Sequence, residues 1–159
     1  MDIFVFKTQG EGIELRPSSV SNHLSDAFEV MACATDSLAR AFRSVVKGIP
    51  DMEINIVLTD IEQISALNKK FRKINQVTDV LSFPFEEQGL GEVWVCPEVV
   101  QENANSYNEE YKDELLRVVI HGMLHLFGYD HEKPYIRGTD KLEKMFDLQE
   151  QILNKVLEK

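Results

Sequence analysis

The sequence predicts an α+β (mixed α/β) fold in which helices pack on a small sheet of about four strands. Short apolar segments of strand length lie in the first two thirds of the chain, and longer segments with helical periodicity dominate the last third. The 159 residues are 43% hydrophobic and 28% charged, which suits one globular core, and no repeat or linker divides them. We therefore expect a single domain over residues 1–159.

The expected strands are short and end at turn residues. Four segments carry strand patterns: residues 3–7, 53–58, 79–83 and 91–95. Pro84 and Pro97 are expected to stop the third and fourth strands. Gly89 and Gly91 supply the turn between those two strands, which predicts a hairpin or adjacent strands.

The expected helices are longer and carry capping signals. Five segments have helical patterns: residues 18–47, with or without a break, and residues 60–71, 98–107, 109–127 and 138–157. Thr59 or Asp60 can cap the second helix. Asn108 can cap the fourth, and Gly128 is a natural stop at its end.

Composition bears on the compartment and on membrane association. No run of 18 apolar residues exists, so we expect no membrane span and no membrane partner. The first residues, MDIFVFKTQGEGIE, lack the basic start and long apolar stretch of a signal peptide. Cys33 and Cys96 form no CxxC pair and are expected to be buried, reduced thiols. These observations predict a cytoplasmic protein.

The net charge of −10 disfavours nucleic acid at long range but leaves room for a local basic patch. Four basic residues fall within five positions: Lys69, Lys70, Arg72 and Lys73. They can bind a polyanion, or they can simply offset the dipole at a helix C-terminus.

Three of the four histidines lie in the segment HGMLHLFGYDH, namely His121, His125 and His131. The first two are spaced i, i+4 and therefore share a helical face. On a helical wheel the apolar residues cover roughly 0° to 180°, whereas these two imidazoles fall near about 240° and 280°, beside Glu114 and Arg117. Core packing therefore does not explain the pair.

His131 follows Gly128 by three residues, and glycine allows the sharp turn that would return the chain toward the first two histidines. Three neutral imidazoles with water in the fourth position are typical of catalytic zinc. A structural zinc would need a fourth protein ligand, for which Cys96 is the only candidate thiol. A chance pair or a surface cluster is the alternative to a metal site.

The spacing His-x3-His-x2-Gly-x2-His is also that of metzincin proteases. Their general base is the glutamate directly after the first histidine, and Gly122 stands at that position here. Glycine cannot move a proton, so the standard peptidase mechanism lacks its base. We expect a zincin-like central helix with differently organised chemistry.

Three ordered segments resemble the YbeY family of bacterial rRNA-maturation metallo-endoribonucleases: LNKKFRKINQVTDVLSFPFEE, LGEVWVCPEVV and HGMLHLFGYDH. The resemblance covers roughly residues 53–157. It implies one zinc per chain on His121, His125 and His131, and a functional arginine at Arg72. It also implies single-strand-specific RNA cleavage in 16S rRNA 3′-end maturation and ribosome quality control.

The chain departs from the family pattern at two places. Asn75-Gln76 stands where the family often has Lys-Asp, and Glu92 stands where it has Asp. Neither departure touches an implied metal ligand, but the first can alter contacts beside Arg72.

In the resulting hypothesis, zinc binds a phosphate oxygen, activates water, or does both. Arg72 neutralises charge on the phosphoryl group, and Lys69, Lys70 and Lys73 hold the RNA backbone. The expected partners are single-stranded RNA or rRNA and the ribosome or a ribosomal protein, and DNA is not expected. The sequence leaves open whether the nucleophile is water or the RNA 2′-OH.

Three other polar residues are further candidates for the site. Asp130 either orients a ligand imidazole or serves as a turn residue before the third histidine. Ser82 is expected to be an ordinary strand residue, and Glu114 a surface helix position rather than a proton carrier.

Two alternatives belong to other functional classes. One is a ribosome-assembly factor with a mainly structural zinc. The acidic net charge is compatible with this function, because an acidic surface could bind a basic ribosomal protein. The other is a zincin-type peptidase, which the missing glutamate disfavours.

Overall fold

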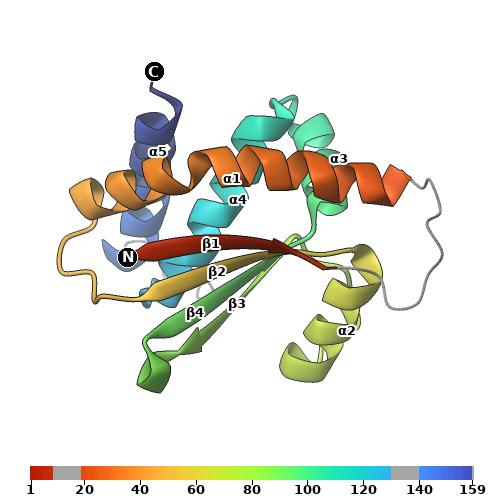
Figure 1. Cartoon of the computed structure of the whole chain (residues 1–159), viewed down its shortest axis with the longest axis horizontal. Helices are drawn as coiled ribbons and strands as arrows, with labels where there is room; N and C mark the ends of the chain where they lie inside the picture. The colour runs from red at the N-terminus through yellow and green to blue at the C-terminus, as the bar shows by residue number, and fades with distance from the viewer. Residues whose placement is uncertain (9–18, 130–139, 159) are drawn as a thin grey trace.

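The computed structural model describes residues 1–8, 19–129 and 140–158, with the backbone alone given for 19–22 and 140–143. Four strands form one sheet: β1 (Asp2–Lys7), β2 (Glu53–Leu58), β3 (Val80–Phe85) and β4 (Leu90–Val95). Their order is β1-β2-β4-β3, with β1, β2 and β4 parallel and β3 antiparallel to β4 (Figure 1). The predicted α+β class with four strands is confirmed, and so is the hairpin.

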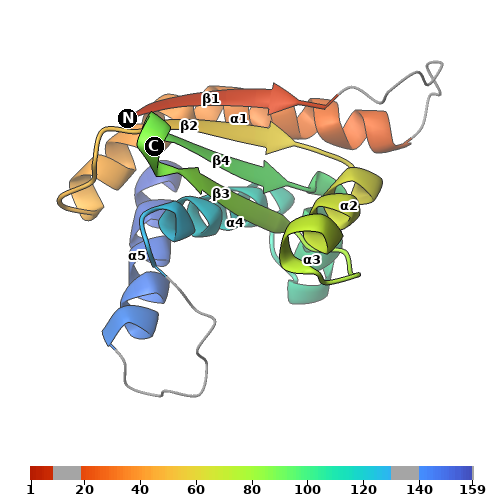
Figure 2. The same ribbon diagram turned by 90° about the horizontal axis from the view of Figure 1, so that it is seen from below.

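Five helices accompany the sheet: α1 (Ser19–Val45), α2 (Ile61–Arg72), α3 (Pro97–Tyr107), α4 (Tyr111–Leu126) and α5 (Asp140–Leu157). Helices α1 and α4 pack on one face of the sheet, and α5 rests against both of them (Figures 1 and 2). Helix α3 packs against α4, and α2 lies beside β3 near the ends of the strands. None of the described helices is long and apolar enough to cross a membrane.

The main core lies between the sheet and α1, α4 and α5. Alternate residues of the central strands point into it and are fully buried: Ile54, Ile56 and Leu58 of β2, and Val93 and Val95 of β4. A smaller cluster of Ile64, Leu81 and Cys96 lies on the opposite face, beneath α2.

Several predicted boundaries are wrong. Strand β3 continues through Pro84 to Phe85, because it is an edge strand and a missing N–H costs nothing on its open side. A short 3₁₀ turn over Glu86–Gln88 makes the connection, and Gly89 closes it at φ 61°. Gly91 belongs to β4 rather than to the turn.

Two further predictions, a helix cap and the burial of a cysteine, are also wrong. Asn108 does not cap α4: it ends α3 in the left-handed conformation at φ 54°, and Glu110 precedes the first turn of α4. Helix α1 is continuous from Ser19 to Val45. Cys96 is buried as expected, but Cys33 is exposed.

Helix α4 lies in close contact with the sheet at Gly122. A Cβ atom there would lie 2.6 Å from Cγ1 of Val93 and 2.9 Å from Cγ2 of Val80. The Ser82 hydroxyl donates a hydrogen bond of 2.8 Å to the Gly122 carbonyl oxygen. Ser82 is therefore a strand residue that ties the sheet to α4, and glycine is required at 122 by packing.

Gly122→Ala should lower the free energy of unfolding of the metal-free chain by about 1–3 kcal/mol, the cost of overpacking. Helix propensity alone would predict the opposite sign, a gain of about 1 kcal/mol for alanine. Urea unfolding in chelator measures the difference. Gly122→Ala should cost less stability in a Val93→Ala background than in the wild-type background, and a more stable Gly122→Ala protein would contradict the packing account.

Candidate metal centre

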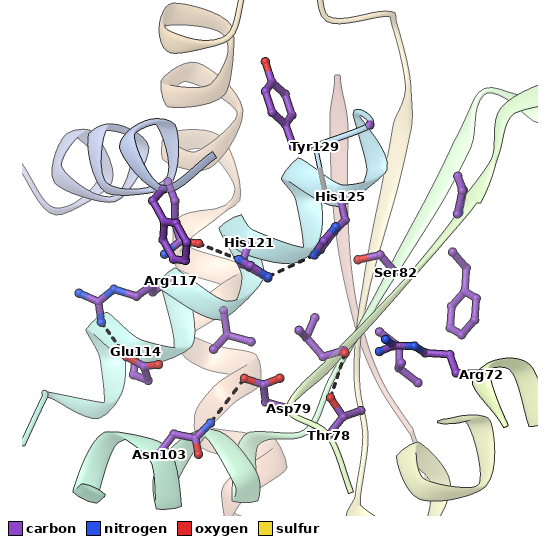
Figure 3. Close-up of a pocket in the computed structure, with 18 of the residues that line it drawn as sticks. Arg72, Thr78, Asp79, Ser82, Asn103, Glu114, Arg117, His121, His125 and Tyr129 are labelled. Atoms are coloured by element: carbon purple, nitrogen blue, oxygen red, sulfur yellow. Dashed lines mark hydrogen bonds and ion pairs between the residues drawn. The ribbon is translucent and has the colours of Figure 1, made fainter. Parts of the chain in front are cut away.

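Side chains from five elements surround one cavity of about 1040 Å³ (Figure 3). Strand β3 and helix α4 form its inner wall, and α2, α3 and α5 contribute the edges. His121, His125 and Arg117 of α4 line it, as the helical wheel predicts from their shared sector. Ser82 and Arg72 line the same cavity from the sheet side and from α2.

The two α4 histidines converge on one point. Their Nε2 atoms lie 3.2 Å apart, and the rings are inclined at 84° with centroids 4.7 Å apart. Two imidazole nitrogens bound to one tetrahedral zinc at about 2.0–2.1 Å would lie about 3.3 Å apart. The donor atoms therefore fit a shared metal ion. His131, the third expected ligand, and Asp130 lie outside the described residues.

A buried amide holds the first imidazole. Nδ1 of His121 lies 2.8 Å from Oε1 of Gln149, whose side chain comes from α5 and is 5% exposed. The amide nitrogen of Gln149 lies 3.5 Å from Oε1 of Glu150, and a carboxylate can only accept. Its amide oxygen is then the atom that faces His121. In the neutral imidazole of His121, Nδ1–H then donates to this amide oxygen, and the lone pair of Nε2 is directed to the pocket.

The same network continues along α4. Arg117 donates to Oε1 of Glu150 at 3.0 Å and to Oε2 of Glu114 at 2.6 Å. Burial opposes the charge on Arg117, but the hydrogen bonds that it donates to Glu150 and Glu114 outweigh this effect and raise the pKa of Arg117. Glu114 is 6% exposed, so its prediction as a surface position is wrong. Its carboxylate is paired within α4 with Arg117, and Arg117 also reaches Glu150 of α5.

Asp79 is a carboxylate of the pocket wall that sequence reasoning treated only as the first residue of a strand. It precedes β3, and Nδ2 of Asn103 on α3 donates to its Oδ2 at 3.4 Å. Burial raises the pKa of Asp79, against smaller lowering effects from its hydrogen bonds and from His121. Neither Asp79 nor Gln149 could be recognised as a pocket residue from the sequence, because their partners, Asn103 and His121, lie on helices remote in sequence.

The residues of the expected basic patch divide into two groups. Arg72 ends α2, and its guanidinium extends toward the pocket (Figure 3). Lys69, Lys70 and Lys73 are exposed around the same helix end and are not part of the described pocket wall.

Cys96 lies away from the pocket wall in the cluster beneath α2, where burial raises the pKa of its thiol to about 11. A thiolate ligand from this residue is therefore disfavoured. Among the described residues no group of three metal-binding side chains occurs, which leaves the two histidines as the described part of the candidate centre.

Comparisons with known proteins agree on one family. The model for "Endoribonuclease YbeY" matches residues 19–157. The endoribonuclease YbeY of Thermotoga neapolitana is 44% identical over 110 residues, which cover 69% of this chain and 74% of that protein. The Aquifex aeolicus endoribonuclease YbeY is 36% identical over 114 residues, with 69% and 73% covered.

A solved structure supports the fold. The solution structure of a Thermotoga maritima protein has a TM-score of 0.56 and 34% sequence identity, and the alignment covers 97% of this chain and 88% of that one. The family model spans both α4 histidines, Arg72 and the whole sheet except β1. The chain therefore belongs to the YbeY family of endoribonucleases.

Proposed function

We propose that this chain is a zinc-dependent endoribonuclease that cuts single-stranded RNA in the cytoplasm, in 16S rRNA 3′-end maturation and ribosome quality control. The convergence of the His121 and His125 Nε2 atoms at 3.2 Å, in a pocket that Arg72 also lines, carries the proposal. Two facing imidazoles and one arginine supply a metal site and an anion site in the same cavity.

The metal would be held by His121, His125 and His131, with one ion per chain. Zinc bound there would polarise a phosphate oxygen and lower the pKa of a bound water toward about 7. The hydrogen bond from Nδ1 of His121 to Gln149 keeps the imidazole in the tautomer that offers Nε2 to the pocket.

Arg72 would bind the phosphoryl group of the substrate. Its planar fork of donors suits two oxygens of a phosphodiester, and its position at the C-terminus of α2 leaves the side chain exposed to an incoming strand. Lys69, Lys70 and Lys73 would attract the flanking phosphates from outside the pocket. This local positive charge would attract RNA to the pocket although the chain as a whole has a net charge of −10.

The packing of α4 bears on the peptidase alternative. A glutamate at 122, the base of a metzincin, would collide with Val80 and Val93 before it reached the pocket. The chain therefore lacks the protease base for a steric reason. Either water or the RNA 2′-OH can serve as nucleophile, and the product ends distinguish them: a 2′,3′-cyclic phosphate marks attack by the 2′-OH.

The acidic surface supports a partner on the ribosome. A net charge of −10 complements a basic ribosomal protein, which would bring the pocket to its rRNA. An assembly factor that binds in this way without cutting is the second candidate, and the cleavage assay separates the two.

His125→Ala and Arg72→Ala should each lower cleavage of a labelled single-stranded RNA by about 100-fold or more, because each removes a group that stabilises charge at the phosphate. The histidine variant should also lose bound zinc in elemental analysis, whereas the arginine variant should keep it. His23→Ala and Arg40→Ala, on α1, are the matched controls and should cut normally. Zinc-loaded wild type that cuts no RNA would overturn the nuclease proposal.

Gln149→Leu should weaken zinc binding by about 10–100-fold, because His121 loses the acceptor that holds its Nδ1 proton. Competition with a chromophoric chelator measures the affinity, and ¹⁵N chemical shifts of the imidazole report its tautomer. Gln149→Glu keeps an acceptor at this position and should restore most of the affinity. Equal zinc affinity in the leucine variant and wild type would show that the contact does not position the ligand.

A further inference from the structure

Three aromatic side chains stand exposed at the edge of the pocket. Phe71 is 56% exposed, Tyr107 66% and Phe146 52%, and they come from α2, α3 and α5 respectively. Leaving large rings in water forgoes the free energy of burying them, and such residues gathered around one cavity mark a binding surface. We call these three residues the aromatic rim.

Each ring is close in sequence to a polar residue of the pocket wall: Arg72 follows Phe71 directly, whereas Asn103 before Tyr107 and Gln149 after Phe146 lie one helical turn away on the same face. The aromatic rim and these polar residues therefore come from the same three helices, α2, α3 and α5. A ligand whose charged part reached Arg72 would have its other parts within reach of these rings.

The α2 side of the rim combines an aromatic ring with positive charge. The ammonium of Lys70 lies 5.2 Å from the centroid of Phe71, and Phe83 packs edge-on against Phe71 at 5.2 Å between centroids. Phe83 fixes the position of the ring, and Lys69 and Lys73 add charge beside it. Flat apolar faces next to cations suit a ligand that carries both anionic groups and planar rings.

We propose that Phe71, Tyr107 and Phe146 stack on unpaired bases of single-stranded RNA, on either side of the phosphodiester that enters the pocket. The inference rests on the proposed function and names what selects its substrate. Base–aromatic stacking is tolerant of sequence because every base has a π face. Paired bases in a duplex are already stacked on each other and cannot reach the rim, so the rim selects for single strands.

A metal-free binding experiment tests the rim separately from catalysis. A fluorescent single-stranded oligonucleotide with one 2-aminopurine base is titrated with wild type, Phe71→Ala, Tyr107→Ala and Phe146→Ala, in chelator and at one salt concentration. Each variant should raise the Kd by about 5- to 150-fold, the cost of losing one stacked base. Phe4→Ala, whose exposed ring lies on β1 away from the pocket, is the matched control and should leave the Kd unchanged.

Two further measurements identify stacking itself. Wild type should quench 2-aminopurine fluorescence on binding, and the rim variants should quench it less. An abasic strand of equal length keeps its phosphates, so the rim variants should bind it as wild type does. Tyr107→Phe keeps the ring and should bind like wild type.

Rim variants that bind the normal strand as tightly as wild type would overturn the inference, as would a wild type that binds no RNA, or a Tyr107→Phe variant as weak as Tyr107→Ala. RNA cleavage by wild type with unchanged binding in the variants would refute the rim and leave the nuclease function intact. Binding with rim-dependent quenching but no cleavage when zinc is supplied would support the aromatic rim and refute the nuclease function.

Discussion

The contact between Gly122 and the sheet determines how the rest of the pocket is arranged. With no side chain at 122, α4 lies directly on Val80 and Val93, and the Ser82 hydroxyl bonds its carbonyl oxygen. The helix is thereby held at a rotation that turns His121 and the residue one turn later toward the cavity. The same contact leaves no room for a glutamate at 122, so close packing both turns the imidazole pair toward the cavity and excludes a protease-type base.

A second constraint is the packing of α5 against α4, because residues of α5 contact Arg117 and His121. The carboxylates of Glu114 and Glu150 hold Arg117 between the two helices, and Gln149 accepts the Nδ1 proton of His121. The Glu150 side chain is 47% exposed, and ion pairs at the surface stabilise little by themselves. Their role here is geometric. They fix α5 against α4, and the Gln149 contact then decides which nitrogen of His121 faces the pocket.

The sequence predicted the elements well because strand and helix periods are local properties. It also placed His121 and His125 off the apolar stripe, and the pocket contains both. It failed where another element decides the outcome. Glu114 is buried because α5 brings Glu150 to its arginine partner, and Gln149 lies 28 residues beyond the histidine that it holds. An edge position, which no local pattern reveals, lets β3 run through Pro84.

We propose that the imidazoles of His121, His125 and His131 hold one zinc, with one position left open for the substrate. X-ray absorption at the zinc edge tests it most directly, since it counts and identifies the ligands in the loaded protein. The account predicts three imidazole nitrogens and one oxygen, all at about 2.0–2.1 Å, with one imidazole lost in His125→Ala. A sulfur ligand at about 2.3 Å, or four protein ligands with no exchangeable oxygen, would contradict an open catalytic site.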